Sequence, residues 1–149
     1  MTEILFYHLT ESTLEDALPG LLERSVERGW KVVVQTGTEE RRDALDQHLW
    51  VYSQESFLAH GCDHEDEASE IPVVLTTSEL NPNAASVRIL VDGAVPGPLE
   101  SYERAVFLFD GHDETQVEDA RGQWKRLKTG AHELTYWQQN ADRKWERKA

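Results

Sequence analysis

A cluster of potential metal ligands is the first feature whose residue types could do chemistry. The segment HGCDHEDE (60–67) contains His60, Cys62, His64 and several carboxylates. Its H-x-C-x-H spacing matches none of the common zinc patterns, and solvated side chains in an acidic loop are the more ordinary interpretation. We therefore predict neither a metal nor any other cofactor.

Catalytic groups are the second feature to consider. Cys62 is the only cysteine, and as a nucleophile it would need a paired base and an oxyanion site, which no motif marks. A lone cysteine fits a reducing compartment. The turn after the first strand candidate, HLTEST, has no glycine to let backbone N–H groups approach a phosphate, and GxxxxGK[ST] is absent. No catalytic residue is predicted.

The third feature is a basic segment in an acidic chain. The formal net charge is −13, yet eight of the 15 Lys and Arg residues lie between Arg121 and the last residue, against three acids. The acidic remainder should repel nucleic acid, because DNA binding depends on phosphate neutralisation by Lys and Arg. We predict little direct nucleic-acid binding, whereas a small basic site suits a short acidic peptide or a compact anion.

Helical spacing divides this basic segment into two stripes. The expected core face consists of Val117, Ala120, Trp124 and Leu127. Arg121, Lys125 and Lys128 follow i, i+4, i+7 and form a second stripe beside it, while Arg126 points away. Two interpretations stay open: a solvated face whose cations complement the helix macrodipole, or a receptor for peptides that combine acids with an aromatic residue.

The elements that must position these groups follow from the hydrophobic pattern. Strands are predicted at 3–9, 30–36, 71–77, 86–93, 104–111 and, at an edge, 131–137. Three helices are predicted. The first is opened by Ser12 and Glu15 with capping-box spacing and ended by Gly29, and at Pro19-Gly20 it either kinks or begins its regular part. The others are 38–50, capped by Thr38, and 113–130. Residues 51–70 read as a long surface connection. Alternating strands and helices predict an α/β fold with a mostly parallel sheet.

Length and composition favour one folded domain over residues 1–149, with a frayed basic end over about 140–149. No apolar run approaches the ~20 residues that span a bilayer. The start, MTEILFYHLT, lacks the features of a secretory signal. We expect a cytoplasmic protein without membrane association.

Several blocks together resemble the chi subunit family of bacterial DNA polymerase III. They are FYHL, LDQHLW leading into ESFLAHG, IPVVLT, and ARGQWKRLKTGAHELTYWQQ, in order from about residue 4 to 145. Ala59 departs from the family, which usually has proline there, and so does Pro19-Gly20. The resemblance implies a Rossmann-like three-layer fold with no nucleotide-binding loop, and an adaptor without catalysis of its own inside the polymerase holoenzyme.

The resemblance also implies partners and site residues. In the family, chi links the clamp-loader complex, through the psi subunit, to the acidic C-terminal tail of single-stranded-DNA-binding protein, which ends in acids and a phenylalanine. Arg121, Trp124, Lys125 and Lys128 match the tail-binding helix. Binding of psi, or of an accessory helicase, maps to the loop with Phe57 and to nearby Trp50, although both could instead be core anchors. The rival hypothesis is a small α/β enzyme that uses a nucleotide or phosphate.

Overall fold

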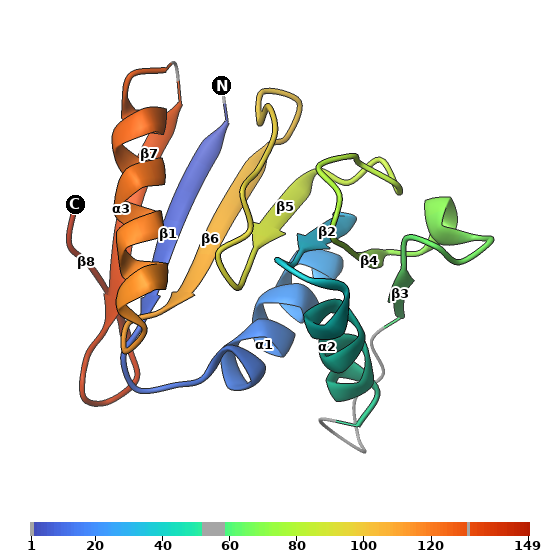
Figure 1. Ribbon diagram of the computed structural model, residues 1–149, viewed down its shortest axis with the longest axis horizontal. Helices are drawn as coiled ribbons and strands as arrows, with labels where there is room; N and C mark the ends of the chain where they lie inside the picture. The colour runs from blue at the N-terminus through green and yellow to red at the C-terminus, as the bar shows by residue number, and fades with distance from the viewer. Residues whose placement is uncertain (1, 52–58, 131) are drawn as a thin grey trace.

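The fold is organised around one eight-stranded sheet. The computed structural model describes residues 2–51, 59–130 and 132–149 (Figure 1). The strand order is β3-β4-β2-β5-β6-β1-β7-β8, and every neighbouring pair is parallel except β7 and β8. The strands are β1 (Glu3–Leu9), β2 (Val32–Gln35), β3 (His60–Cys62), β4 (Val73–Thr76), β5 (Val87–Leu90), β6 (Arg104–Asp110), β7 (Glu133–Gln139) and β8 (Trp145–Arg147). The predicted mostly parallel α/β sheet is confirmed.

Helices cover both faces of this sheet. They are α1 (Leu14–Glu27), α2 (Glu39–Val51) and α3 (Glu114–Lys128), with a short 3-10 helix, η1 (Ala68–Glu70). Val32 and Val34 of β2 pack in the same cluster as the apolar residues of α1 and α2, whereas Val33 belongs to the cluster that contains α3. Because both faces of β2 are covered, the strand reads as a continuous apolar run. The result is the three-layer arrangement expected of a Rossmann-like fold.

Helix α1 begins after a different residue from the one predicted, whereas it ends where the sequence predicts. Thr13, not Ser12, is the N-cap, and its hydroxyl accepts from the Asp16 N–H at 3.2 Å. Ser12 is instead engaged by a distant side chain, because the Gln139 amide donates to its hydroxyl at 3.0 Å. At the other end Gly29 adopts a φ of +82°, the left-handed conformation that commonly terminates a helix.

Helix α1 continues through Pro19, so its regular part does not begin there. Proline lacks the N–H that would bond to the carbonyl of Glu15, four residues earlier. That carbonyl has another partner, because the His48 Nε2 of α2 lies 2.7 Å from it. A side chain from the next helix thus satisfies the backbone group that the proline leaves without a helical donor.

Both outer strands of the sheet depart from the sequence prediction. Residues 51–70 are not only a surface connection, because His60, Gly61 and Cys62 are buried and pair with β4. The segment 140–149 is not frayed, because β8 pairs with β7 and the Trp145 ring packs 4.7 Å from that of Tyr7. β8 also displaces β7 from the predicted edge position.

Arg88 of β5 is a fully buried cation, only 1% exposed. Its guanidinium donates two hydrogen bonds to the Gln35 Oε1, at 2.7 and 3.1 Å, and one to the Tyr102 hydroxyl at 2.9 Å. Two more go to the backbone carbonyls of Leu80 and Ser78, at 3.0 and 2.5 Å. Arg88 therefore ties the segments after β4 and before β6 to the sheet.

Candidate functional site

The predicted basic stripe borders a hollow between α3, β7 and the residue Ala149, which follows β8. The hollow has a volume of about 340 Å³, and we name it the basic hollow. Its lining residues are Arg121, Trp124, Lys125, Lys128, Tyr136 and Ala149. The structure thus brings together all four residues that the sequence assigned to one binding helix, and it adds two others. In Figure 1 the chain end runs beside α3.

The position of these side chains on α3 follows from two features of the helix: the residue that caps its start and the face that packs against the sheet. Asp113 caps the helix and accepts from the N–H groups of Thr115 and Gln116 at 3.0 and 3.2 Å. Ala120 and Leu127 are buried against the sheet, which leaves Arg121, Lys125 and Lys128 exposed together.

Arg126 lies apart from this site, as predicted. It is absent from the residues lining the basic hollow and bonds instead to the Gln123 Oε1, at 2.6 and 3.0 Å. The helical assignment of the two stripes is confirmed.

Aromatic rings form the apolar part of the basic hollow. Trp124 is half-buried and meets the Tyr136 ring edge-on, with centroids 5.9 Å apart and planes at 78°. It makes a second edge contact with Phe6 of β1, at 5.3 Å. Such contacts fix the ring, so the hollow has a firm apolar wall next to its cations.

Tyr136 is a lining residue that the sequence prediction missed, and it is held from behind by His8. The Tyr136 hydroxyl lies 2.7 Å from His8 Nδ1. Burial lowers the pKa of His8, and the charges of Arg121 and His112 lower this pKa further. A neutral His8 accepts the hydrogen bond that Tyr136 donates. Strand alternation could have indicated that Tyr136 and Leu134 share the face under α3, but not the bond to His8.

Gly111 supplies the space for this pair. A Cβ at Gly111 would collide with the His8 imidazole and with the Leu9 carbonyl. The glycine after β6 is therefore part of the support of the basic hollow, although it lies outside the hollow itself.

The cations of the basic hollow have no acidic partner in the part of the chain that the structure describes. Among the described residues, no carboxylate forms an ion pair with Arg121, Lys125 or Lys128. Three exposed cations beside an apolar cavity can receive carboxylates and an apolar group at the same time. This is the chemistry that an acidic peptide with an aromatic residue requires.

The second predicted surface, at the other end of the sheet, is only partly described. Trp50 is 51% exposed, so it is not a core residue, and its ring lies 4.3 Å from that of His60. Phe57 lies outside the described residues. Beside Trp50 is an open hollow of about 630 Å³ whose other lining residues are Ala59, His60, Glu65, Asp66, Glu67, Glu70, Ile71 and Pro72.

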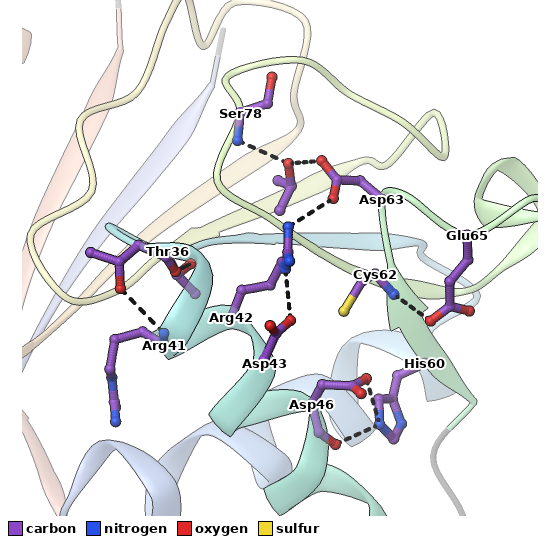
Figure 2. Close-up of polar contacts among 12 residues, drawn as sticks. Thr36, Arg41, Arg42, Asp43, Asp46, His60, Cys62, Asp63, Glu65 and Ser78 are labelled. Carbon is purple, nitrogen blue, oxygen red and sulfur yellow. Dashed lines mark hydrogen bonds and ion pairs between the residues drawn. The ribbon is translucent and has the colours of Figure 1, made fainter.

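The potential metal ligands at 60–67 are used in local structure instead (Figure 2). His60 is buried, and its Nε2 lies 3.0 Å from the Asp46 carbonyl of α2. Burial raises the pKa of the Cys62 thiol to about 12, which leaves little of the thiolate that a nucleophile or metal ligand needs. Within the described ranges, no three His, Cys, Asp or Glu side chains are grouped so that they could hold a metal ion.

Two carboxylates of the same segment, Asp63 and Glu65, also have partners. Asp63 accepts from the Thr76 hydroxyl at 2.5 Å and lies 3.7 Å from the Arg42 guanidinium, while the Glu65 Oε1 accepts from the Cys62 N–H at 3.0 Å. These contacts connect α2 and β4 with β3 and the residues that follow it, as can be followed in Figure 2. They anchor the short edge strand.

The crevice at the carboxyl ends of β1 and β6 is where a Rossmann-like sheet would bind a nucleotide. The hollow there is about 310 Å³, and Arg41 is among its cationic lining residues. This guanidinium is already paired with Glu15 at 2.8 Å and Asp92 at 2.9 Å. Glu11 and Asp110 add further negative charge to the lining. A crevice with this charge is unfavourable for phosphates.

No helix in the described part of the chain is long and apolar enough to cross a membrane.

Comparisons with known proteins agree on one family. The family model described as DNA polymerase III chi subunit, HolC, matches residues 1–135. A "Probable DNA polymerase III subunit chi" of Rickettsia prowazekii is 28% identical over 91 residues, which are 61% of this chain and 55% of that protein. A "DNA polymerase III subunit chi" of Pseudomonas aeruginosa is 28% identical over 111 residues, 72% of this chain and 77% of that one. The chain thus spans little more than half the length of the Rickettsia relative.

Proposed function

Because the chain belongs to the DNA polymerase III chi subunit family, we propose that it is a non-catalytic accessory subunit of the polymerase holoenzyme. In this role it binds the acidic C-terminal tail of single-stranded-DNA-binding protein through the basic hollow. It connects that tail to the clamp-loader complex, and so couples the polymerase to DNA that is coated by single-stranded-DNA-binding protein.

One observation carries this proposal: three cations that form no ion pair with any described residue line an apolar hollow that also contains two aromatic rings. Its volume of about 340 Å³ is near the lower end of ligand pockets, ~300–1,000 Å³, which suits one aromatic side chain. Arg121, Lys125 and Lys128 can bond to the carboxylates of the tail, while Trp124 and Tyr136 contact its terminal phenylalanine ring.

The other end of the sheet supports the second half of the connection. We assign Trp50, together with Phe57 from the sequence, to binding of a psi subunit or an accessory helicase. An exposed Trp is the kind of residue that dominates the free energy of protein association. The nucleotide-using enzyme remains less favoured, because Arg41 in the expected crevice is already neutralised.

The test is a titration of a fluorescent tail peptide against charge-reversal variants. Arg121→Glu and Lys125→Glu should each weaken binding, by about three- to thirtyfold if an exposed pair is lost and a repulsion of similar size replaces it. Affinity should fall as salt rises. A peptide without its terminal phenylalanine should bind poorly even at low salt, because the apolar contact is missing.

Arg126→Glu is the matched control, since it has the same change in net charge on another side of the same helix. It should reduce affinity much less than Arg121→Glu. Equal affinities for the wild type and all three variants would show that the basic stripe is only a solvated face.

A further inference from the structure

The basic hollow has a second wall that helix α3 does not provide. Ala149, beyond β8, lines this wall, and Lys148 directly precedes it. In the register of β7 and β8, Trp137 is opposite Arg147 and Gln138 is opposite Glu146. The pairing continues beyond β8 with two residues opposite Tyr136. The Lys148 N–H donates to the Tyr136 carbonyl at 2.7 Å, while Ala149 donates to the same carbonyl at 3.4 Å and accepts from the Tyr136 N–H at 3.3 Å. Residues directly opposite each other in a sheet share a face. Lys148 therefore lies on the face of Tyr136, which is the face that α3 covers.

A separate set of contacts shows which residues of β8 lie on the opposite face of the sheet. Trp145 packs with Tyr7 in the cluster on the α1 side, and Trp137, the partner of Arg147, belongs to the same cluster. Arg147 thus lies on the other face from Lys148, and its Nε donates to the Ala149 carbonyl at 3.0 Å. Two adjacent cations of one segment, Lys148 and Arg147, lie on opposite faces of the sheet.

We propose that Lys148 is a fourth cation of the peptide site and contacts ligand carboxylates that the α3 stripe does not reach. This rests on the proposed function of the basic hollow. Lys148 lies beyond residues 1–135, which match the family model, so the inference comes from the strand register of this chain.

The geometry of an extended peptide explains why a second wall matters. Successive side chains of an extended chain point in opposite directions. A basic stripe on one helix can therefore meet only alternate carboxylates in a run of acids. With Arg121, Lys125 and Lys128 on one side and Lys148 on the other, adjacent acids both find a cation. The site is then suited to a ligand with consecutive acidic residues.

Lys148 is available for such a contact. Its only ion pair in the described residues is with Glu146, at 3.8 Å, and both side chains are about half exposed. A long, exposed pair of this kind contributes little to stability and exchanges readily for a ligand carboxylate. Glu146 lies on the same face and so opposes an acidic ligand.

Three variants of β8 and its extension test the proposal, with a labelled peptide of consecutive aspartates ending in phenylalanine with a free carboxylate as the probe. Lys148→Glu should weaken binding by about three- to tenfold, and Glu146→Gln should strengthen it by about twofold, the sizes typical of exposed charge pairs. Arg147→Glu, with the same change in net charge on the other face, should change affinity by less than about twofold. Thermal unfolding of each variant establishes that β8 is retained.

The outcomes separate this proposal from the proposed function. If Arg121→Glu weakens binding while Lys148→Glu and Arg147→Glu have equal effects, the basic hollow binds the peptide but the second wall is refuted. If the wild type does not bind the peptide at low salt, both proposals are overturned. A larger loss for Lys148→Glu than for Arg147→Glu supports the second wall.

Discussion

Replacement of Arg88 by methionine should be the most destabilising single change outside the apolar core. Methionine retains most of the apolar volume of the side chain but removes all the donors of the guanidinium. Arg88 is 1% exposed, so water cannot easily replace them. The change therefore tests whether the segments beside β5 are held by this one side chain.

The magnitude follows from the five hydrogen bonds of Arg88, which use all five N–H groups that a guanidinium possesses. Methionine would leave four oxygens, on Gln35, Ser78, Leu80 and Tyr102, without this donor. Each buried group left unsatisfied costs about 1–3 kcal/mol, and local relaxation recovers part of that, so we expect a loss of about 3–5 kcal/mol in the free energy of unfolding. This is a large share of the ~5–15 kcal/mol typical of a domain.

Urea unfolding followed by tryptophan fluorescence measures the decrease in the free energy of unfolding of Arg88→Met. Arg104→Met on the adjacent strand β6 is the control, because the pair of Arg104 with Glu3, at 3.1 Å, is partly exposed. That variant should lose no more than about 1 kcal/mol. If Arg88→Met costs no more than Arg104→Met, the guanidinium does not hold these segments and the reasoning is wrong.

Four further predictions concern other parts of the molecule. The pKa of His8 in the folded protein lies below its ordinary 6.5. The contribution of His8 to stability is therefore complete above pH 6.5 and is lost as pH falls through the lower folded-state pKa. In urea unfolding between pH 7.5 and 5, the free energy of unfolding should depend less on pH for His8→Gln than for the wild type. Cys62, with a thiol pKa of about 12, should react with iodoacetamide at pH 8 only when the protein unfolds, and mass spectrometry that finds rapid native labelling would refute its burial. Trp50→Ala and Phe57→Ala should each abolish co-purification with a psi subunit or helicase while the melting temperature changes little; a large fall in that temperature would identify a core residue instead. The isolated protein should not shift single-stranded DNA in a gel at physiological salt, because its formal net charge is −13.

Local patterns were sufficient for the parts of the fold that depend on neighbours in sequence. The helical spacing of Ala120, Trp124 and Leu127 predicts which face of α3 is buried, and the structure confirms it. Thr38 and Gly29 have the local roles expected of a helix cap and a helix terminator, since the Thr38 hydroxyl accepts from the Arg41 N–H at 3.2 Å. These residues act within one turn of the chain.

The predictions that were wrong involve partners far away in sequence. Ser12 is not the cap because Gln139 engages it, and Pro19 does not break α1 because His48 bonds to the carbonyl that the proline leaves without a donor. The support of Tyr136 by His8 spans 128 residues. No local pattern contains such contacts, since they depend on which strands become neighbours.

Short outer strands were missed for a related reason. β3 and β8 have three residues each, too few for a period to be visible. β3 is recognisable only once β4 is placed beside it, and β8 only once Trp145 meets Tyr7. The second wall of the basic hollow consequently could not be predicted from the sequence.

The width of the sheet separates its two outer strands electrostatically. Neighbouring strands lie ~4.8 Å apart, so β3 and β8, at opposite ends of the eight-stranded order, are about 34 Å apart. That distance is several times the Debye length of ~8 Å at physiological salt. The acids after β3 therefore do not weaken the electrostatic potential of the cations around α3 and β8, and opposite charges stay separated along the sheet. Within about one Debye length of the β8 end, an anionic ligand would be attracted to these cations with little opposition from the acids after β3.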